Sequence, residues 1–306
     1  MKLIRFKSGL TLPPISVGCM RIKDMDLPAI QKLMHTALDA GVNFFDHADI
    51  YGGGECEEKF SKAMELHDPA KREKLVIQTK CGIIRGGRYD FSKEHILASV
   101  EGSLKRLNTD YIDILLLHRP DALCQPEEVA EALHELHRTG KVLHFGVSNH
   151  TPLQIELLQR ALDVPLEVNQ IQMSIAHCPA IAQGMNANTY VENSVDHDGG
   201  MLDYCRLKDI RLQAWSPVRD AKYRECFIDS EHYPELNAKM AEIGEKYGLT
   251  KEGVAMAWLT RHPAGIQPVT GTTRPERLAA CIKGAETEIT REEWYELYRA
   301  AGNKVL

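Results

Sequence analysis

The chain contains the stretch Asn43-Phe44-Phe45-Asp46-His47-Ala48-Asp49-Ile50-Tyr51-Gly52, in which a short apolar run changes abruptly to polar residues. Such a change is typical of a buried parallel strand that leaves its sheet and continues into a loop. The glycines at 52–54 then allow a sharp turn of the backbone before the next helix. Asp46 and Tyr51 therefore follow the end of one strand, where a carboxylate and a phenol together could perform proton chemistry.

Strand patterns of this kind recur along the chain and alternate with helical patterns. Besides the opening stretch, strand-like runs occupy residues 15–18, 75–80, 112–118, 142–147, 166–171, 210–215 and 266–269. Helical periodicity or a helix start lies between most of them. The segment that begins Thr151-Pro152-Leu153-Gln154, for example, has a capping box with proline at the first helical position. Eight strand–helix units in a chain of this length predict a (β/α)8 TIM barrel.

The ends of the chain add one element each to this barrel. Residues 1–15 have the pattern of a β-hairpin with a turn at Ser8-Gly9, and a final helix is predicted to begin at Thr290. No linker or shift in composition divides the chain, so residues 1–306 are expected to form a single domain. Two polar segments, 176–200 and 217–234, follow the sixth and seventh strands. They are expected to form walls and lids at the carboxyl end of the barrel, where active sites lie.

Composition excludes several classes of function. A hydrophobic content of 43%, a charged content of 26% and a net charge of −6 are those of an ordinary globular protein without a basic surface for nucleic acid. No apolar run approaches the ~18 residues of a membrane span, and no signal-peptide core is present. The eight cysteines are scattered without C-x-x-C spacing, which favours reduced thiols, no metal site and a cytoplasmic location.

Four side chains that end predicted strands are the candidates for catalysis. Asp46 and Tyr51 follow the second strand, Lys80 ends the third and His118 ends the fourth. In a barrel the strand ends converge on one mouth, so these side chains are expected to be neighbours. A lysine beside the phenol would favour the phenolate and so improve Tyr51 as a proton donor, while a carboxylate would keep that lysine charged. A histidine could orient a carbonyl oxygen.

The same segments resemble the aldo-keto reductases. The resemblance rests on residues 43–52, Thr79-Lys80, 110–120, 140–149, Asn169-Gln170 and Trp215-Ser216-Pro217, in this order along the chain. It implies a barrel enzyme that reduces an aldehyde or ketone carbonyl with NADP(H). By position, Tyr51 would be the proton donor, Lys80 and Asp46 the pair that tunes it, and His118 the group that orients the carbonyl.

The resemblance also implies a set of cofactor contacts. Ser148, Asn149 and Gln170 match residues that hydrogen-bond the nicotinamide carboxamide, and Trp215 stands where the family usually has a stacking tyrosine. The remaining positions match contacts to the pyrophosphate and the 2′-phosphate: Ser216, Gly271, Thr272, Thr273, Arg274 and Arg277. Hydroxyls and two arginines at a helix start suit a phosphate on general grounds as well.

Two other functions stay open from the sequence. One is a metal-dependent barrel hydrolase with ligands drawn from Asp46, His47, Asp49, His118 and His144. The other is a regulatory or sensor subunit that binds the nucleotide but has low turnover. The predicted partner is a small carbonyl substrate, in a pocket built from loops 81–91 and 119–125 and the 176–200 segment. No nucleic acid or membrane is expected, and no oligomeric state is predicted.

Overall fold

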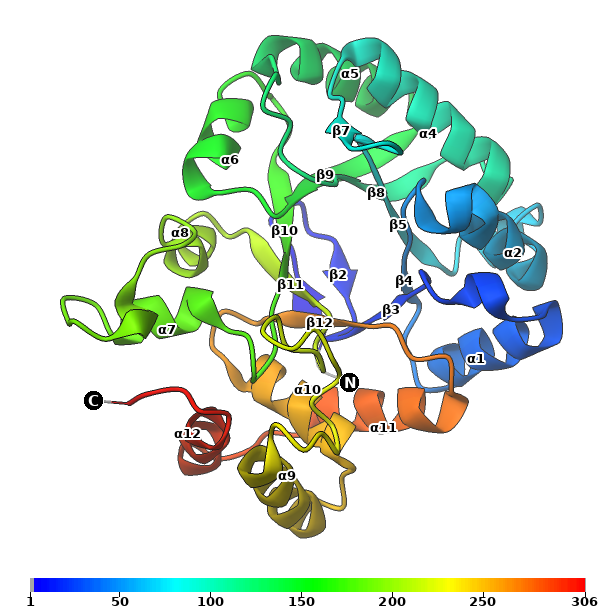
Figure 1. The fold of residues 1–306 in the computed structure, drawn as a ribbon. Coiled ribbons are helices and arrows are strands. Elements are labelled where there is room, and N and C mark those ends of the chain that lie inside the picture. The colour runs from blue at the N-terminus through cyan, green and yellow to red at the C-terminus, as the bar shows by residue number, and fades with distance from the viewer. Residues whose placement is uncertain (1–2, 306) are drawn as a thin grey trace.

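The computed structural model describes residues 3–305, and its central feature is a closed barrel of eight parallel strands (Figure 1). The strands in barrel order are β3 (Ser16–Gly18), β4 (Phe44–Asp46), β5 (Val76–Cys81), β8 (Ile112–Leu117), β9 (Val142–Ser148), β10 (Leu166–Gln172), β11 (Arg211–Trp215) and β12 (Gln267–Thr270). β12 pairs with β3, which closes the barrel. The predicted (β/α)8 fold is confirmed, and the observed strand ends lie within about one residue of the predicted ones.

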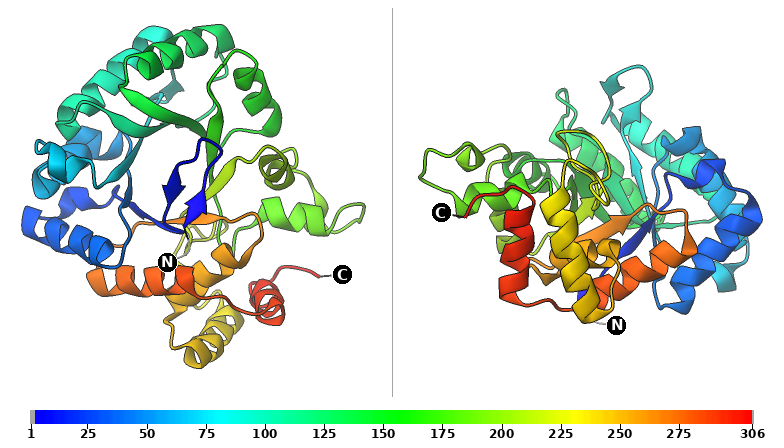
Figure 2. Two further views of the ribbon diagram at one scale, coloured as in Figure 1. Left: turned by 180° about the vertical axis from the view of Figure 1, so that it is seen from behind. Right: turned by 60° about the horizontal axis from the view of Figure 1, so that its bottom comes forward.

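Helices surround the barrel on all sides (Figures 1 and 2). Those that follow barrel strands directly or cover them are α1 (Leu27–Asp39), α2 (Glu55–Met64), α4 (Lys93–Leu107), α5 (Pro126–Arg138), α6 (Pro152–Gln159), α8 (Met201–Leu207), α10 (Lys251–Arg261) and α11 (Pro275–Glu286). Further helices are α3 (Pro69–Arg72), α7 (Pro179–Met185), α9 (Pro234–Tyr247) and the predicted C-terminal α12 (Arg291–Ala300). Short 3-10 turns are η1 (Ile22–Asp24), η2 (Tyr51–Gly54) and η3 (Glu192–Ser194). The sequence pattern did not predict α7 and α9.

The N-terminal hairpin closes one end of the barrel. β1 (Ile4–Arg5) pairs antiparallel with β2 (Thr11–Leu12), as predicted, and the hairpin crosses the barrel when it is viewed from behind (Figure 2, left). Phe6 and Leu12 are buried against side chains of the barrel interior such as Phe44. The barrel interior at this end is therefore sealed by apolar contacts.

Strand alternation decides which residues of the opening stretch face inward. Phe44 packs inside the barrel, whereas Phe45 points outward and its ring lies 5.0 Å from that of Phe60 on α2. Because strand side chains alternate between the two faces, Asp46 points inward like Phe44. Asp46 therefore lies at the inner wall of the barrel, one pleat above an apolar layer.

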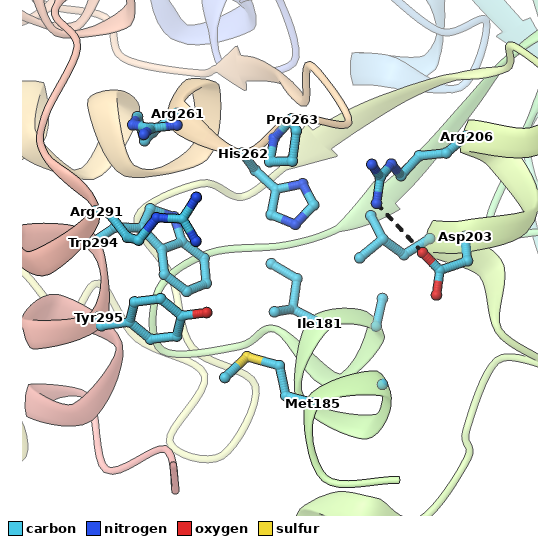
Figure 3. A pocket seen from close by; sticks show the side chains of 13 residues that line it. Ile181, Met185, Asp203, Arg206, Arg261, His262, Pro263, Arg291, Trp294 and Tyr295 are labelled. Carbon is cyan, nitrogen blue, oxygen red and sulfur yellow. Dashed lines mark ion pairs between the residues drawn. The ribbon is translucent and has the colours of Figure 1, made fainter.

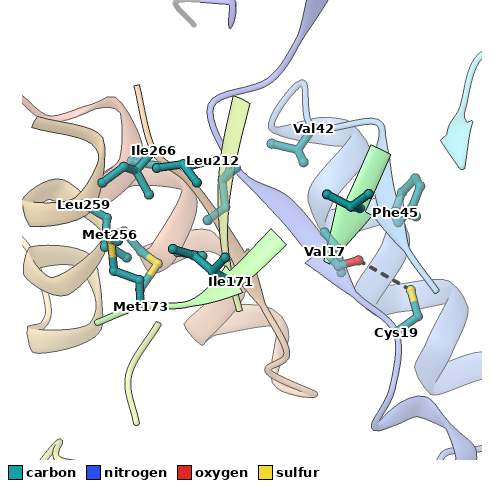
Figure 4. Packing of buried hydrophobic residues seen from close by; sticks show 14 of the residues in the cluster. Val17, Cys19, Val42, Phe45, Ile171, Met173, Leu212, Met256, Leu259 and Ile266 are labelled. Carbon is teal, nitrogen blue, oxygen red and sulfur yellow. Dashed lines mark hydrogen bonds between the residues drawn. The ribbon is translucent and has the colours of Figure 1, made fainter. Parts of the chain in front are cut away.

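The main core lies between the barrel and the helices around it. Figure 4 shows part of this core, in which Ile171 and Leu212 of neighbouring strands pack close to Met256 and Leu259 of α10. All four side chains are almost completely buried. This packing fixes the strands rigidly and so fixes the side chains at their carboxyl ends.

None of the helices within residues 3–305 has the length and hydrophobicity that crossing a membrane would require.

A second β-hairpin, β6 (Ile83–Ile84) and β7 (Arg88–Tyr89), lies within the 81–91 loop. All eight cysteines are free thiols in the structure.

Candidate active site

The ammonium group of Lys80 is the centre of the site. Its side chain is fully buried, and Nζ donates to Asp46 Oδ1 (2.8 Å) and Oδ2 (2.7 Å), to the His47 carbonyl (2.7 Å) and to Tyr51 Oη (3.2 Å). Burial alone would lower the pKa of Lys80, but Asp46 and Tyr51 outweigh it and the pKa is raised. Lys80 is therefore charged at neutral pH, and its three hydrogens are committed to groups around the barrel mouth.

Tyr51 begins η2, directly above Lys80. Gly52 and Gly53 follow it with φ angles of 59° and 73°, a left-handed conformation that glycine adopts without strain. The pKa of Tyr51 is raised: burial is the largest influence, and Lys80 acts in the opposite direction. Lys80 thus favours the phenolate as expected from the sequence, but burial is stronger, so the net effect is a raised pKa. Tyr51 is protonated at neutral pH and able to donate.

His118 follows β8, and its ring lies beside the Tyr51 phenol. The two rings meet edge to face with centroids 6.0 Å apart, and His118 Nδ1 is buried without a hydrogen-bond partner among the described residues. Burial, and then the charges of Lys80 and Arg119, lower the pKa of His118 to about 2. The imidazole is consequently neutral, so it can donate one hydrogen bond but carries no charge.

Two buried glutamines donate to the carboxylate of Asp46 and two more extend the network, an arrangement that the sequence did not reveal. Gln78 Nε2 (2.6 Å) and Gln170 Nε2 (2.9 Å) both donate to Asp46 Oδ1. Both also donate to Gln213 Oε1, and Gln213 Nε2 in turn donates to Gln267 Oε1 (3.0 Å). The polar end of the barrel is therefore filled by a connected network and not by an apolar layer. A glutamine at an inward position of four strands was the signal available in the sequence.

A cavity of about 700 Å³ opens above these residues. Asp46, Tyr51 and His118 line its inner end, while Lys80 lies beneath the surface. The cavity is also lined by every residue for which the resemblance implies a cofactor contact: Ser148, Asn149, Gln170, Trp215, Ser216, Gly271, Thr272, Thr273, Arg274 and Arg277. The structure therefore brings the complete set of sequence-predicted site residues together, in a continuous cleft that runs outward from Tyr51.

The wall nearest to Tyr51 is fixed by a short chain of hydrogen bonds. Ser148 Oγ donates to the Gln170 carbonyl (2.8 Å) and accepts from Asn149 Nδ2 (2.8 Å). The Trp215 indole donates to Asn149 Oδ1 (3.2 Å). Both amide hydrogens of Gln170 are donated within the network, to Asp46 and to Gln213, so its Oε1 remains as an acceptor for a group in the cavity. These groups are the donors and acceptors that a carboxamide needs.

The outer end of the cavity is the start of α11. Arg274 is the N-cap residue and Pro275 the first helical residue, so free backbone N–H groups face this end. Arg274 forms no ion pair among the described residues, and Arg277 Nε lies 3.3 Å from Glu252 Oε1. Two guanidinium groups and a helix N-terminus fit a phosphate, although Glu252 offsets part of the positive charge.

One of the two predicted lid segments lines the cavity and the other does not. Residues 217–219, Cys226, Ile228 and Asp229 of the 217–234 segment form a wall, and Lys251 Nζ holds Asp229 Oδ1 at 2.5 Å. No described residue of 176–200 or of the 81–91 loop lines this cavity, contrary to expectation. The first part of 176–200 folds into α7, which packs outside the barrel, and this explains the difference.

His47 and Asp49 take no part in the cavity. The ring of His47 packs against Phe60, with centroids 4.6 Å apart, and burial lowers its pKa to about 3. Asp46, another of the ligands considered for a metal, accepts hydrogen bonds from Lys80 and from glutamine amides. Within residues 3–305 no group of three or more His, Cys, Asp or Glu residues is arranged to hold a metal ion. The geometry therefore gives no support to the metal-dependent hydrolase.

Asp49 is expected to make stability depend on pH. Burial, and then the charge of Glu57, raise its pKa to about 7, against ~3.9 in an unfolded chain. The folded state thus holds this proton more tightly, so stability falls as pH rises from about 4 to 7. Asparagine does not titrate, so Asp49→Asn should raise the free energy of unfolding at both pH values. We expect the increase to be about 2–3 kcal/mol larger at pH 8 than at pH 5. Urea unfolding at both pH values measures this difference, and the exposed Asp39→Asn is the control. An equal gain at both pH values would contradict the titration of Asp49.

A closed parallel barrel with a buried Lys–Asp pair and a tyrosine at its mouth defines a class of barrel oxidoreductases. The model of the Aldo/keto reductase family matches residues 14–301, and the chain belongs to this family. The uncharacterized oxidoreductase YcsN of Bacillus subtilis is 36% identical over 98% of both chains. A 6-dehydroglucose reductase of Agrobacterium fabrum is 36% identical over 99% of both. The aldo-keto reductase of Klebsiella pneumoniae, solved in complex with NADPH, has the same fold with a TM-score of 0.79 at 21% identity, covering 99% of this chain and 96% of that one.

Proposed function

We propose that this protein reduces an aldehyde or ketone to an alcohol with NADPH, using Tyr51 as the proton donor. The observation that supports this most is the contact between Tyr51 Oη and Lys80 Nζ (3.2 Å) at the inner end of the cavity. The family and the NADPH complex of the Klebsiella relative agree with the proposal. When bound, the nicotinamide supplies the hydride for the carbonyl carbon.

The residues of this chain would handle the carbonyl oxygen. Lys80 donates to Tyr51 Oη, so the phenol directs its own hydrogen away from the lysine and into the cavity. As negative charge develops on the substrate oxygen, Tyr51 transfers that proton, and the nearby ammonium group stabilises the phenolate left behind. The neutral His118 donates a hydrogen bond that orients the same oxygen. Asp46 is not a proton carrier in this scheme. It holds Lys80 charged and in place.

The cofactor is proposed to lie along the cavity, with the carboxamide at Ser148, Asn149 and Gln170 and the 2′-phosphate at the start of α11. The polar groups of the inner wall suit an amide, and Trp215 offers a flat face for stacking. Arg274 and Arg277 suit a phosphate. These two ends favour NADPH over NADH.

We expect the double variant Arg274→Gln and Arg277→Gln to lose this preference. A hydrogen bond to a charged group contributes about 1.5–3 kcal/mol, so NADPH affinity should fall roughly 10–100-fold. NADH lacks the 2′-phosphate, and its affinity should change little. Fluorescence titration with both nucleotides measures this difference. Equal losses for NADH and NADPH would place the 2′-phosphate elsewhere.

The reductase and the sensor subunit predict different outcomes in one assay. NADPH consumption is followed against a panel of aldehydes and ketones, together with NADPH binding. Because Arg119 and Arg21 line the cavity and the Arg119 guanidinium lies 5.7 Å from the Trp215 ring, the panel should include oxygen-rich carbonyls. The name of the Agrobacterium relative makes 6-dehydroglucose one of them. Turnover supports the reductase. Tight NADPH binding with no turnover on any member supports the sensor.

A further inference from the structure

A second cavity lies outside the barrel, between α7, α8, the end of α10 and the first turns of α12 (Figure 3). Its volume is about 410 Å³, within the range of small-molecule pockets. It shares no lining residue with the cavity at the barrel mouth. The outer cavity, as we call it, therefore has no part in the proposed reduction and requires its own explanation.

The charged groups of the outer cavity are mostly positive. Three arginines line it, Arg206, Arg261 and Arg291, against the single carboxylate of Asp203. Arg206 Nη1 lies 3.6 Å from Asp203 Oδ1, while Arg291 forms no ion pair among the described residues. The chain as a whole has a net charge of −6, so this excess of positive charge is local. It favours an anionic ligand.

Further hydrogen-bond donors remain available in the same place. Arg261 Nε donates to the Ile289 carbonyl (2.8 Å) and lies 3.9 Å from Glu288 Oε1, whereas its terminal amino groups have no hydrogen-bond partner within residues 3–305. His262 lies between Arg206 and Arg291 in Figure 3. Its Nδ1 accepts from the Ala264 N–H (3.2 Å), and burial lowers its pKa to about 4. The neutral ring therefore carries its hydrogen on Nε2, as a donor.

The floor of the outer cavity is apolar and rigid. Trp294 is 7% exposed and stacks on both Trp258 (ring centroids 4.8 Å apart, interplanar angle 7°) and Tyr298 (5.6 Å, 10°), while Tyr295 meets it edge to face. Its indole N–H donates to the Trp258 carbonyl (3.0 Å), so no polar group of Trp294 requires a ligand. Ile181 of α7 and Leu202 of α8 are buried and complete the apolar lining.

We propose that the outer cavity is a binding site for a small organic anion that carries a carboxylate on an apolar body. Guanidinium groups recognise carboxylates through paired, charge-assisted hydrogen bonds, and Arg291 is free to make them. The body of such a ligand would contact Ile181, Leu202 and the part of Trp294 that lines the cavity, where its burial adds affinity. The site does not depend on the reductase function, because none of its residues belongs to the barrel mouth.

Benzoate is the simplest probe, and calorimetric titration of the NADPH-saturated protein tests for its binding. Arg291→Gln should weaken benzoate at least tenfold. Arg299→Gln, on the same helix and outside the cavity, should have no effect. Gly184→Phe should abolish binding by filling the cavity. Gly184 is exposed, and a Cβ there meets no atom within 4 Å, so this variant should fold normally.

Two comparison ligands, one without the charge and one without the apolar body, complete the test. Benzamide lacks the charge and inorganic phosphate lacks the apolar body, so each should bind at least tenfold more weakly than benzoate. Equal binding of either would overturn the proposed ligand class. Absence of benzoate binding at millimolar concentration, or binding that survives both Arg291→Gln and Gly184→Phe, would overturn the site itself. None of these outcomes bears on carbonyl reduction, which the NADPH assay tests separately.

Discussion

Tyr51→Phe should lower kcat by about 10²–10⁴ and leave NADPH affinity within about twofold of wild type. The substitution removes one hydroxyl group and keeps the ring that packs beside His118. The proton for the carbonyl oxygen would then have to come from water, because His118 is neutral and Lys80 is enclosed by its four acceptors. Steady-state kinetics on a substrate identified in the carbonyl panel, with separate NADPH titration, measure both quantities.

The matched control for this prediction is Tyr190→Phe. Tyr190 is fully exposed and lies outside the barrel mouth, so loss of its hydroxyl should change neither kcat nor NADPH binding. A Tyr51→Phe protein with near-normal turnover would remove Tyr51 from the role of proton donor. A loss of NADPH binding in the same variant would point to a structural role in place of a catalytic one.

Lys80→Met should abolish turnover and lower the free energy of unfolding by about 3–5 kcal/mol. The methionine matches the length of the lysine stem but leaves the Asp46 carboxylate charged, buried and without its cation. Asp46 is only 2% exposed, so water compensates poorly for the lost ammonium group. Urea unfolding monitored by circular dichroism measures the stability, and the carbonyl assay measures the activity.

The double variant Asp46→Asn with Lys80→Met separates stability from activity. An asparagine keeps an oxygen that can accept from Gln78 and Gln170, and it carries no charge to be buried. We therefore expect the double variant to recover much of the lost stability while remaining inactive. If it is no more stable than Lys80→Met alone, the cost comes from lost packing and not from an unpaired carboxylate. If it is active, Lys80 does not tune Tyr51.

Local patterns in the sequence were sufficient to predict the barrel. Most strands are largely apolar runs that end in polar residues, and glycine, proline or capping signals that act over a few residues lie between them. The catalytic candidates Asp46, Tyr51, Lys80 and His118 could be identified for a related reason, because the carboxyl ends of all strands of a parallel barrel meet at the same mouth. These side chains follow three consecutive strands of the barrel, so the strand order alone implies that they lie close together.

Other features depend on how distant segments pack, and only the tertiary structure decided them. The pKa of Tyr51 lies above its ordinary value because burial outweighs the effect of Lys80. The burial of Tyr51 results from all the segments that surround the barrel mouth. The glutamine network joins β5, β10, β11 and β12. The 176–200 segment leaves the mouth and, through α7, forms the outer cavity with α12, more than a hundred residues later. A sequence pattern reflects the environment of a residue within its own helix or strand. The Tyr51 pKa, the glutamine network and the outer cavity instead arise from contacts between elements that meet only in the folded chain.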